Sequence, residues 1–273
     1  LDNTQTGLQH SNRLDIMGTG TLNIDESRQL QLITQYYKSQ GDDDYGLNLG
    51  KGFSAIRGTS TPFVSNGLNS DRIPGTERHL ISLQYSDSAF LGQELVGQVY
   101  YRDESLRFYP FPTVNANKQV TAFSSSQQDT DQYGMKLTLN SKPMDGWQIT
   151  WGLDADHERF TSNQMFFDLA QASASGGLNN KKIYTTGRYP SYDITNLAVF
   201  LQSGYDINNL FTLNGGVRYQ YTENKIDDFI GYAQQRQIAA GKATSADAIP
   251  GGSVDYDNFL FNAGLLMHIT ERQ

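Results

Sequence analysis

Apolar and polar residues alternate along much of this chain. Residues 197–220, LAVFLQSGYDINNLFTLNGGVRYQ, contain two alternating runs on either side of a four-residue break. Successive side chains of a β-strand point to opposite faces, so a period of two predicts strands with one apolar and one polar face. The pattern recurs nine times, at approximately 12–24, 29–40, 77–86, 92–102, 132–141, 147–160, 194–206, 211–224 and 256–270.

Alternation alone is compatible with two kinds of sheet. A soluble sandwich turns its apolar face inward, whereas a membrane barrel turns the same face outward to lipid. The runs here are about ten residues or longer, while strands of soluble sheets are commonly about 5–6 residues long. Aromatic residues also gather near the ends of the apolar faces, where a membrane interface would lie. They are Tyr85, Tyr101, Tyr133, Trp147, Tyr219 and Tyr221.

The order of the connections favours the barrel. Short turns at 25–28, 87–91, 141–146 and 207–210 alternate with long segments at 41–76, 103–131, 161–193 and 225–255. Outer-membrane barrels have short periplasmic turns and long extracellular loops in this order. Four long segments at one end of a soluble sheet would be unusual. We therefore predict an all-β fold in which the first strand descends toward the periplasm and the ninth ends near Thr270.

Bacterial single-chain barrels have an even number of strands, so nine strands should not close by themselves. We expect residues 1–273 to form one partial β-barrel domain, a segment of a larger antiparallel transmembrane barrel. In the last long segment, residues 232–241, YAQQRQIAAG, predict one short helix that ends at Gly241.

Composition narrows the class further. Hydrophobic residues make up 37% of the chain, aromatics reach 12%, and the mean hydropathy is −0.53, which suits a sheet with one wet face. No stretch approaches the roughly 20 apolar residues of a membrane-spanning helix. Residues 1–20 lack the basic start and apolar run of a signal peptide. The chain has 0 Cys, which excludes disulfides, and its net charge of −8 argues against nucleic-acid binding.

Candidate metal and catalytic residues are sparse. The acidic run Asp42–Asp44 lacks the spacing of a Ca²⁺ loop and is better explained as a solvated loop tip. The histidines are scattered over separate segments without helical spacing, so we expect no protein-built metal site. They are His10, His79, His157 and His268. No nucleophile and base pair is evident, so we predict that the protein is not an enzyme.

Residues 196–220, NLAVFLQSGYDINNLFTLNGGVRYQ, resemble a mid-barrel hairpin of the TonB-dependent siderophore receptors, with Gln220 where that family often has Asp. The segments YYRDESLRFYPFPTVNANKQ at 100–119 and FTSNQMFFDLAQASASGG at 160–177 are similar to receptors for ferric hydroxamate siderophores. The resemblance implies a segment of a barrel of about 22 strands in the bacterial outer membrane, with the plug domain and closing strands absent from residues 1–273.

The resemblance also implies a function and partners. The receptor would bind a ferric hydroxamate siderophore, aerobactin in particular, and would import it by coupling to TonB through the plug. Iron would arrive already chelated, so no resident cofactor is expected. Outer-membrane lipid would contact the apolar face, and bacteriocins or phages also bind loops of such receptors.

We predict that ligand contacts lie near residues 100–109, YYRDESLRFY. The alternation of its strand places Arg102 on the polar face. The next loop is expected to begin with Arg107, Phe108 and Tyr109. Guanidinium groups suit an anionic chelate that bears carboxylates, and aromatic rings would cover its apolar parts. The alternative is that these side chains line a wet lumen and pair with nearby acids. The set is completed by three weaker candidates on neighbouring loops, Arg78, Arg72 and Lys118.

Two other function classes remain open at this stage. A passive outer-membrane channel or an adhesin could use a similar barrel, with its long loops binding host or cell-surface molecules. It would contain no plug and would not depend on TonB. An outer-membrane barrel enzyme would need a nucleophile and a base on lumen-facing positions near the rim, and no convincing Ser-His pair is visible.

Overall fold

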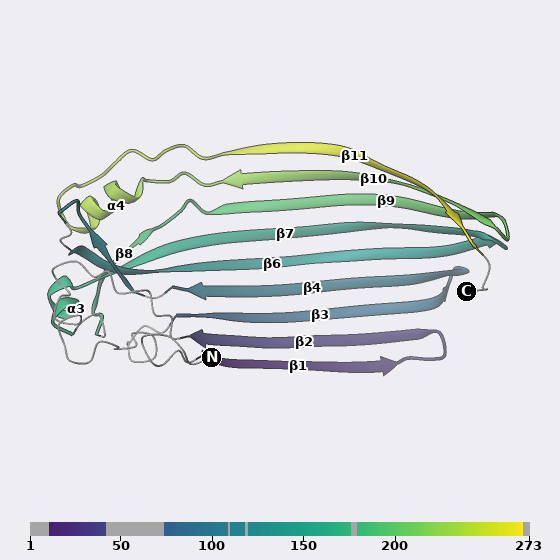
Figure 1. The fold of residues 1–273 in the computed structure, drawn as a ribbon, viewed down its shortest axis with the longest axis horizontal. Helices are drawn as coiled ribbons and strands as arrows, with labels where there is room; N and C mark the ends of the chain where they lie inside the picture. Colours follow the sequence, from purple (N-terminus) through teal and green to yellow (C-terminus); the bar gives the residue numbers. More distant parts are fainter. Residues whose placement is uncertain (1–10, 42–73, 109, 118–119, 176–178, 270–273) are drawn as a thin grey trace.

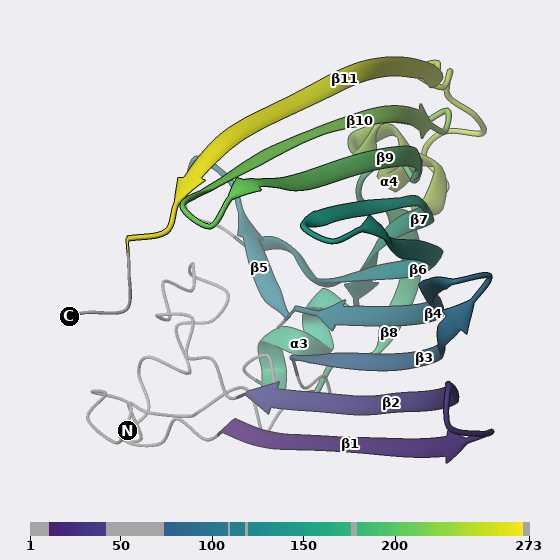
Figure 2. The ribbon, with the colours of Figure 1, turned by 90° about the vertical axis from the view of Figure 1, so that its right-hand side faces the viewer.

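The computed structural model describes residues 11–41, 74–108, 110–117, 120–175 and 179–269. They form one curved antiparallel sheet, with the turns at one end and the longer connections at the other (Figures 1 and 2). The main path of the sheet runs β1-β2-β3-β4-β6-β7-β9-β10-β11, so the nine predicted strands are confirmed. Their bounds are β1 Ser11–Asn23, β2 Arg28–Gly41, β3 Gly75–Phe90, β4 Gln93–Arg107, β6 Val120–Met144, β7 Trp147–Phe167, β9 Tyr192–Asn208, β10 Phe211–Ile226 and β11 Gly252–Met267.

Three of the four short connections are tighter than the sequence indicated, and the first keeps its predicted length of four residues. The turn between β3 and β4 consists of Leu91 and Gly92, whose φ angles are 49° and 78°. Two-residue hairpins with positive φ at both positions match the twist of the flanking strands, which allows β3 and β4 to pair up to their ends. Between β1 and β2, the Asp25 carboxylate accepts hydrogen bonds from the Arg28 guanidinium and from the Ser27 N–H. These contacts lower the pKa of Asp25 and fix that turn.

The register of the strands separates two faces. One row of paired residues crosses five strands on the apolar face. It consists of Leu83, Val99, Met135, Ala155 and Leu197. The neighbouring row of paired residues lies on the polar face. It consists of Gln84, Gln98, Lys136, Asp154 and Ala198. Most residues of the apolar row are exposed, for example Val99 at 53%. Exposed apolar residues in continuous rows require a lipid or protein neighbour, which agrees with the barrel prediction.

Polar side chains on the polar face bind one another across the strands. The Arg218 guanidinium donates to Asp154 Oδ2 at 2.7 Å, joining β10 to β7 across β9. The Asn196 amide donates to Asp156 at 2.9 Å, and Thr222 donates to Asn196 at 2.8 Å. These contacts satisfy the hydrogen-bonding groups of a wet surface at modest free energy for each bond.

Glycines allow two aromatic rings to lie against the polar face. A Cβ at Gly134 would lie 2.8 Å from the Tyr100 ring, and a Cβ at Gly152 would lie 2.7 Å from Cζ of Phe200. The missing side chains therefore make the space that the cross-strand rings occupy.

Several strands extend beyond their predicted ends. Residues 103–107 belong to β4, 120–131 to β6 and 161–167 to β7, although all had been predicted as loop. The longer connections also contain β5 Phe111–Val114, which pairs with β6, and β8 Lys182–Gly187, which pairs with β7. Beside them α3, Leu169–Ser175, lies at the same end of the sheet (Figure 1).

A small core forms where the β6–β7 hairpin meets α3. It contains Phe123, Phe167 and Ala172, each at most 2% exposed.

The predicted helix at 232–241 is confirmed as α4, Tyr232–Ala239. In the described part of the chain, neither helix combines the length and hydropathy needed to cross a membrane.

The two outer strands, β1 and β11, have one neighbour each within the described residues. Unpaired strand edges and a broad apolar face both promote association. We therefore expect the isolated 273-residue chain to self-associate without detergent, as measured by sedimentation velocity. A detergent-free monomer with a sharp thermal unfolding transition would contradict this expectation.

Candidate ligand-binding surface

Arg102 lies in β4 on the polar face, as predicted, between Leu80 of β3 and Gln132 of β6. Its side chain is half-buried. Among the described residues, no acid forms an ion pair with Arg102 at 4.0 Å or less. The fork of donors on its guanidinium is therefore not taken up by an acid of the described chain.

Arg78 was grouped with the loop candidates although it falls within the predicted run 77–86, and the structure places it in β3. It shares the polar face with Arg102, and its Nε donates to Glu104 Oε2 at 2.6 Å. Its guanidinium also lies 5.7 Å from the centre of the Tyr37 ring. Arg78 thus already has an acidic partner, which corresponds to the alternative of arginines that pair with nearby acids.

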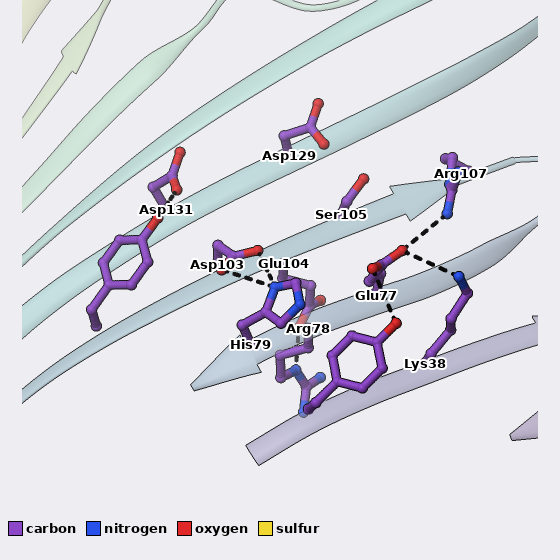
Figure 3. Close-up of polar contacts among 12 residues, drawn as sticks. Lys38, Glu77, Arg78, His79, Asp103, Glu104, Ser105, Arg107, Asp129 and Asp131 are labelled. Carbon is purple, nitrogen blue, oxygen red and sulfur yellow. Dashed lines mark hydrogen bonds and ion pairs between the residues drawn. The ribbon is translucent and has the colours of Figure 1, made fainter. Parts of the chain in front are cut away.

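Arg107 is the last residue of β4, so the prediction that it begins a loop was wrong. It is five positions from Arg102, an odd number, and therefore lies on the opposite face of the strand. There, Glu77 accepts from Arg107 Nη2 at 3.3 Å and lies 3.8 Å from Lys38 Nζ (Figure 3). The Tyr36 hydroxyl donates to the same carboxylate at 3.1 Å. The structure therefore does not bring Arg107 together with Arg102.

Phe108 follows β4, and its N–H donates to the Ser126 carbonyl at 2.9 Å. Because Ser126 belongs to β6, Phe108 is held at the loop end of the sheet rather than in a separate loop. Arg72, Tyr109 and Lys118 lie outside the described residues. Their ligand contacts remain a prediction from the sequence.

Some of the other acidic and histidine candidates lie outside the described residues, and others lie within them. Asp42–Asp44 and His10 lie outside the described residues. His79 Nδ1 lies 2.9 Å from Asp103, and His157 Nε2 lies 3.4 Å from Asp193, so each contacts one carboxylate on the apolar side of its strand (Figure 3 for His79). Within the described ranges, no three His, Asp or Glu side chains converge as metal ligands would.

A second group of basic residues was not predicted, and it lies where the long connections meet. Arg188 follows β8, and its Nη1 donates to Gln164 Oε1 at 2.5 Å. Arg236 lies in α4 with its guanidinium 4.9 Å from the centre of the Phe166 ring and 5.9 Å from that of Tyr232. We call the two arginines and the four side chains around them the arginine–aromatic cluster. They are Gln164, Phe166, Tyr184, Arg188, Tyr232 and Arg236.

Two interactions hold the cluster together. The Gly187 N–H donates to Gln235 Oε1 at 2.7 Å, which joins the end of β8 to α4. Phe166 stacks on Tyr184 with centroids 4.8 Å apart. Burial raises the pKa of Tyr232, while the charges of Arg236 and Arg188 act in the opposite direction. The sequence shows the basic residues but does not indicate that segments about 48 positions apart meet here.

Comparison with known proteins identifies the family. A sequence model described as TonB dependent receptor-like, beta-barrel, matches residues 17–272. The ferric aerobactin receptors of Klebsiella pneumoniae and Escherichia coli are 99% and 94% identical over 273 residues. The rhizobactin receptor of Rhizobium meliloti is 42% identical over 272 residues. The chain spans 37%, 37% and 36% of these three relatives.

Solved structures show the same fold at low sequence identity. The copper transporter OprC is 13% identical with a TM-score of 0.65, covering 96% of this chain and 35% of that one. The ferric citrate transporter FecA is 15% identical with a TM-score of 0.61, covering 96% and 34%. The chain therefore belongs to the TonB-dependent receptor family and is a segment of its outer-membrane β-barrel.

Proposed function

We propose that this segment is part of a receptor that imports a ferric hydroxamate siderophore, ferric aerobactin, across the bacterial outer membrane in a TonB-dependent process. The observation that carries the proposal is the near identity, over the whole segment, to two receptors named for ferric aerobactin. The apolar face would anchor the segment in lipid. The polar face and the longer connections would supply part of the path of the ligand.

The chemistry of the segment supports binding rather than catalysis. Iron would arrive as a finished complex, so the protein would need donors for the chelate and no metal ligands of its own. Arg102 offers such donors from the polar face without an acidic partner within the described chain. Phe108 directly follows β4, and Arg78 lies in β3 with Glu104 as its partner. Arg107 is left out of the proposed contacts because it binds Glu77 on the other face.

The rest of the receptor would provide the energy coupling. A plug domain that contacts TonB would move when the siderophore binds, and no residue of this segment would need to change a covalent bond. A passive channel or an adhesin would not depend on TonB.

We expect Arg102→Ala in the full-length receptor to weaken ferric aerobactin binding by about 10- to 150-fold. The reason is that a hydrogen bond to a charged group contributes about 1.5–3 kcal/mol. The measurement is a titration of intrinsic tryptophan fluorescence in detergent, with a ferric catecholate as the comparison ligand.

Arg107→Ala is the matched control, because it removes the same side chain five residues away on the opposite face. It should leave the Kd unchanged. Equal affinity of Arg102→Ala and wild type would remove Arg102 from the site while leaving the receptor function intact. Failure of the wild-type receptor to bind ferric aerobactin would contradict the proposed function and favour the channel or adhesin.

A further inference from the structure

The arginine–aromatic cluster contains two guanidinium groups without an acidic partner in the described chain. The arginines that do form ion pairs there are Arg28, Arg78, Arg107, Arg159 and Arg218. Arg188 and Arg236 instead contact a neutral amide and aromatic rings. Both side chains are half-buried, so their charges are only partly stabilised by water.

Three buried polar atoms of this region have no hydrogen-bond partner among the described residues. They are Arg188 Nε, Arg236 Nε and the Thr186 hydroxyl. Thr186 of β8 pairs directly with Gln164 of β7, so its side chain lies on the same face of the sheet as Gln164. Leaving a buried donor unpaired is costly because its desolvation is not compensated, and such groups in a native fold call for a partner.

The cluster faces the same way as the rest of the polar face. Asp154, Asp156, Gln164 and Phe166 are separated by even numbers of residues in β7, and the β6–β7 register continues without a shift from Phe123 to Ser141. The cluster therefore lies on the continuation of the polar face, beyond the apolar belt, at the end of the sheet where β8 and α4 lie (Figure 1).

The charges of the two arginines reinforce one another. Both charges favour the ionised form of the Tyr232 hydroxyl and so oppose the rise in its pKa that burial causes. Like charges in a partly desolvated site repel, and an anion placed between them relieves the repulsion. Guanidinium groups bind carboxylates through two parallel N–H donors, and the rings of Phe166, Tyr184 and Tyr232 offer apolar area beside them.

We propose that the arginine–aromatic cluster is a binding site for carboxylate groups of a ferric chelate and selects anionic chelates over neutral ones. The inference rests on the proposed siderophore function and extends it to a defined group of residues. One arginine comes from the connection between β7 and β9 and the other from that between β10 and β11. A bound carboxylate would therefore join two connections that already touch through Gln235 and Gly187.

The test uses the full-length receptor in detergent and two probes, ferric aerobactin and a neutral ferric trihydroxamate. We expect Arg188→Gln and Arg236→Gln each to raise the Kd for ferric aerobactin by about 10- to 100-fold, because each removes one charged fork of donors. The Kd for the neutral chelate should change less than about threefold. Affinity for ferric aerobactin should also fall with added salt more steeply in wild type than in the variants.

Arg159→Gln is the matched control. Arg159 lies in β7 on the apolar side of the strand and is paired with Asp193 and Asp227 at 2.7 and 3.1 Å. This variant should bind ferric aerobactin like wild type. Unchanged affinity in both Arg188→Gln and Arg236→Gln would overturn the proposal.

A second variant tests the site without removing an arginine. Gln164→Glu puts a carboxylate where the Gln164 amide now accepts from Arg188, and it keeps a partner for Ser124, which lies 2.7 Å from Gln164 Nε2. The built-in acid should compete with the ligand and weaken ferric aerobactin binding by about tenfold in a folded receptor. Full affinity in Gln164→Glu would count against the cluster. Absence of binding in wild type would instead contradict the proposed function.

Discussion

Replacing Val199 with arginine is expected to destabilise the barrel by about 2–4 kcal/mol, because a charged side chain would enter the hydrocarbon near the middle of the bilayer. Val199 lies in β9 between Leu153 of β7 and Tyr219 of β10, and it is 55% exposed on the apolar face. Leu197 and Leu201 flank it on the same face. The free energy of unfolding of the full-length receptor in lipid vesicles, from urea titration, measures the effect.

Gln202→Arg is the control for Val199→Arg. Gln202 lies three residues away in β9 on the polar face, opposite Thr150 and Gly216. Arginine there would remain in water, so the change in stability should be within about 0.5 kcal/mol. Similar losses for both substitutions would mean that the assignment of the two faces is wrong.

Gly152→Ala should destabilise the receptor by about 3 kcal/mol, the upper end of the usual cost of overpacking. A Cβ at Gly152 would lie well inside van der Waals contact of the Leu137 carbonyl oxygen and 2.7 Å from Cζ of Phe200. The ring could move, but the carbonyl belongs to the paired strand β6 and could not move without breaking the register. The added methyl group therefore forces apart two strands in the middle of the sheet.

The same urea titration compares Gly152→Ala with Gly97→Ala. Gly97 lies in β4 between β3 and β6, and a Cβ there would lie 3.6 Å from Cδ1 of Leu137, an ordinary van der Waals contact. Its replacement should change stability by less than about 1 kcal/mol, and alanine there reduces the freedom of the unfolded chain. Equal effects at the two glycines would show that close packing at Gly152 does not limit the substitution.

Lipid explains why the strands within the membrane could be predicted. Side chains that meet hydrocarbon are mostly apolar, so the period of two is regular between Ile81 and Tyr85 or between Leu197 and Leu201. Residues 120–131, VTAFSSSQQDTD, have no such requirement, because both faces of that part of β6 lie outside the apolar belt. From Phe123 onward their backbone pairs with β7 all the same, and this pairing has no signature in the pattern.

The alternation of side chains between the two faces of a strand explains which candidate site residues were placed correctly. Arg102 could be placed on the polar face by counting from the apolar residues of its strand, and the structure agrees. Arg107 was misplaced because the strand was predicted to end at 102, whereas counting on through Arg107 would have put it on the face of Val99. Arg188 and Arg236 could not be paired from sequence, since their proximity depends on how two long connections fold onto β7.

The β6–β7 hairpin is also the part of this segment that extends furthest from the membrane. Its strands have 25 and 21 residues, against 13 in β1, and at about 3.3 Å per residue the longer strand measures roughly 80 Å. The hydrocarbon layer accounts for about 30 Å of that length. Among the described elements, α3, β8 and α4 lie at the end of the sheet that an antibody approaching an intact cell would meet (Figure 1). An immunogen built on this hairpin would need to keep strands β5 and β8, since both pair with it and shape its surface.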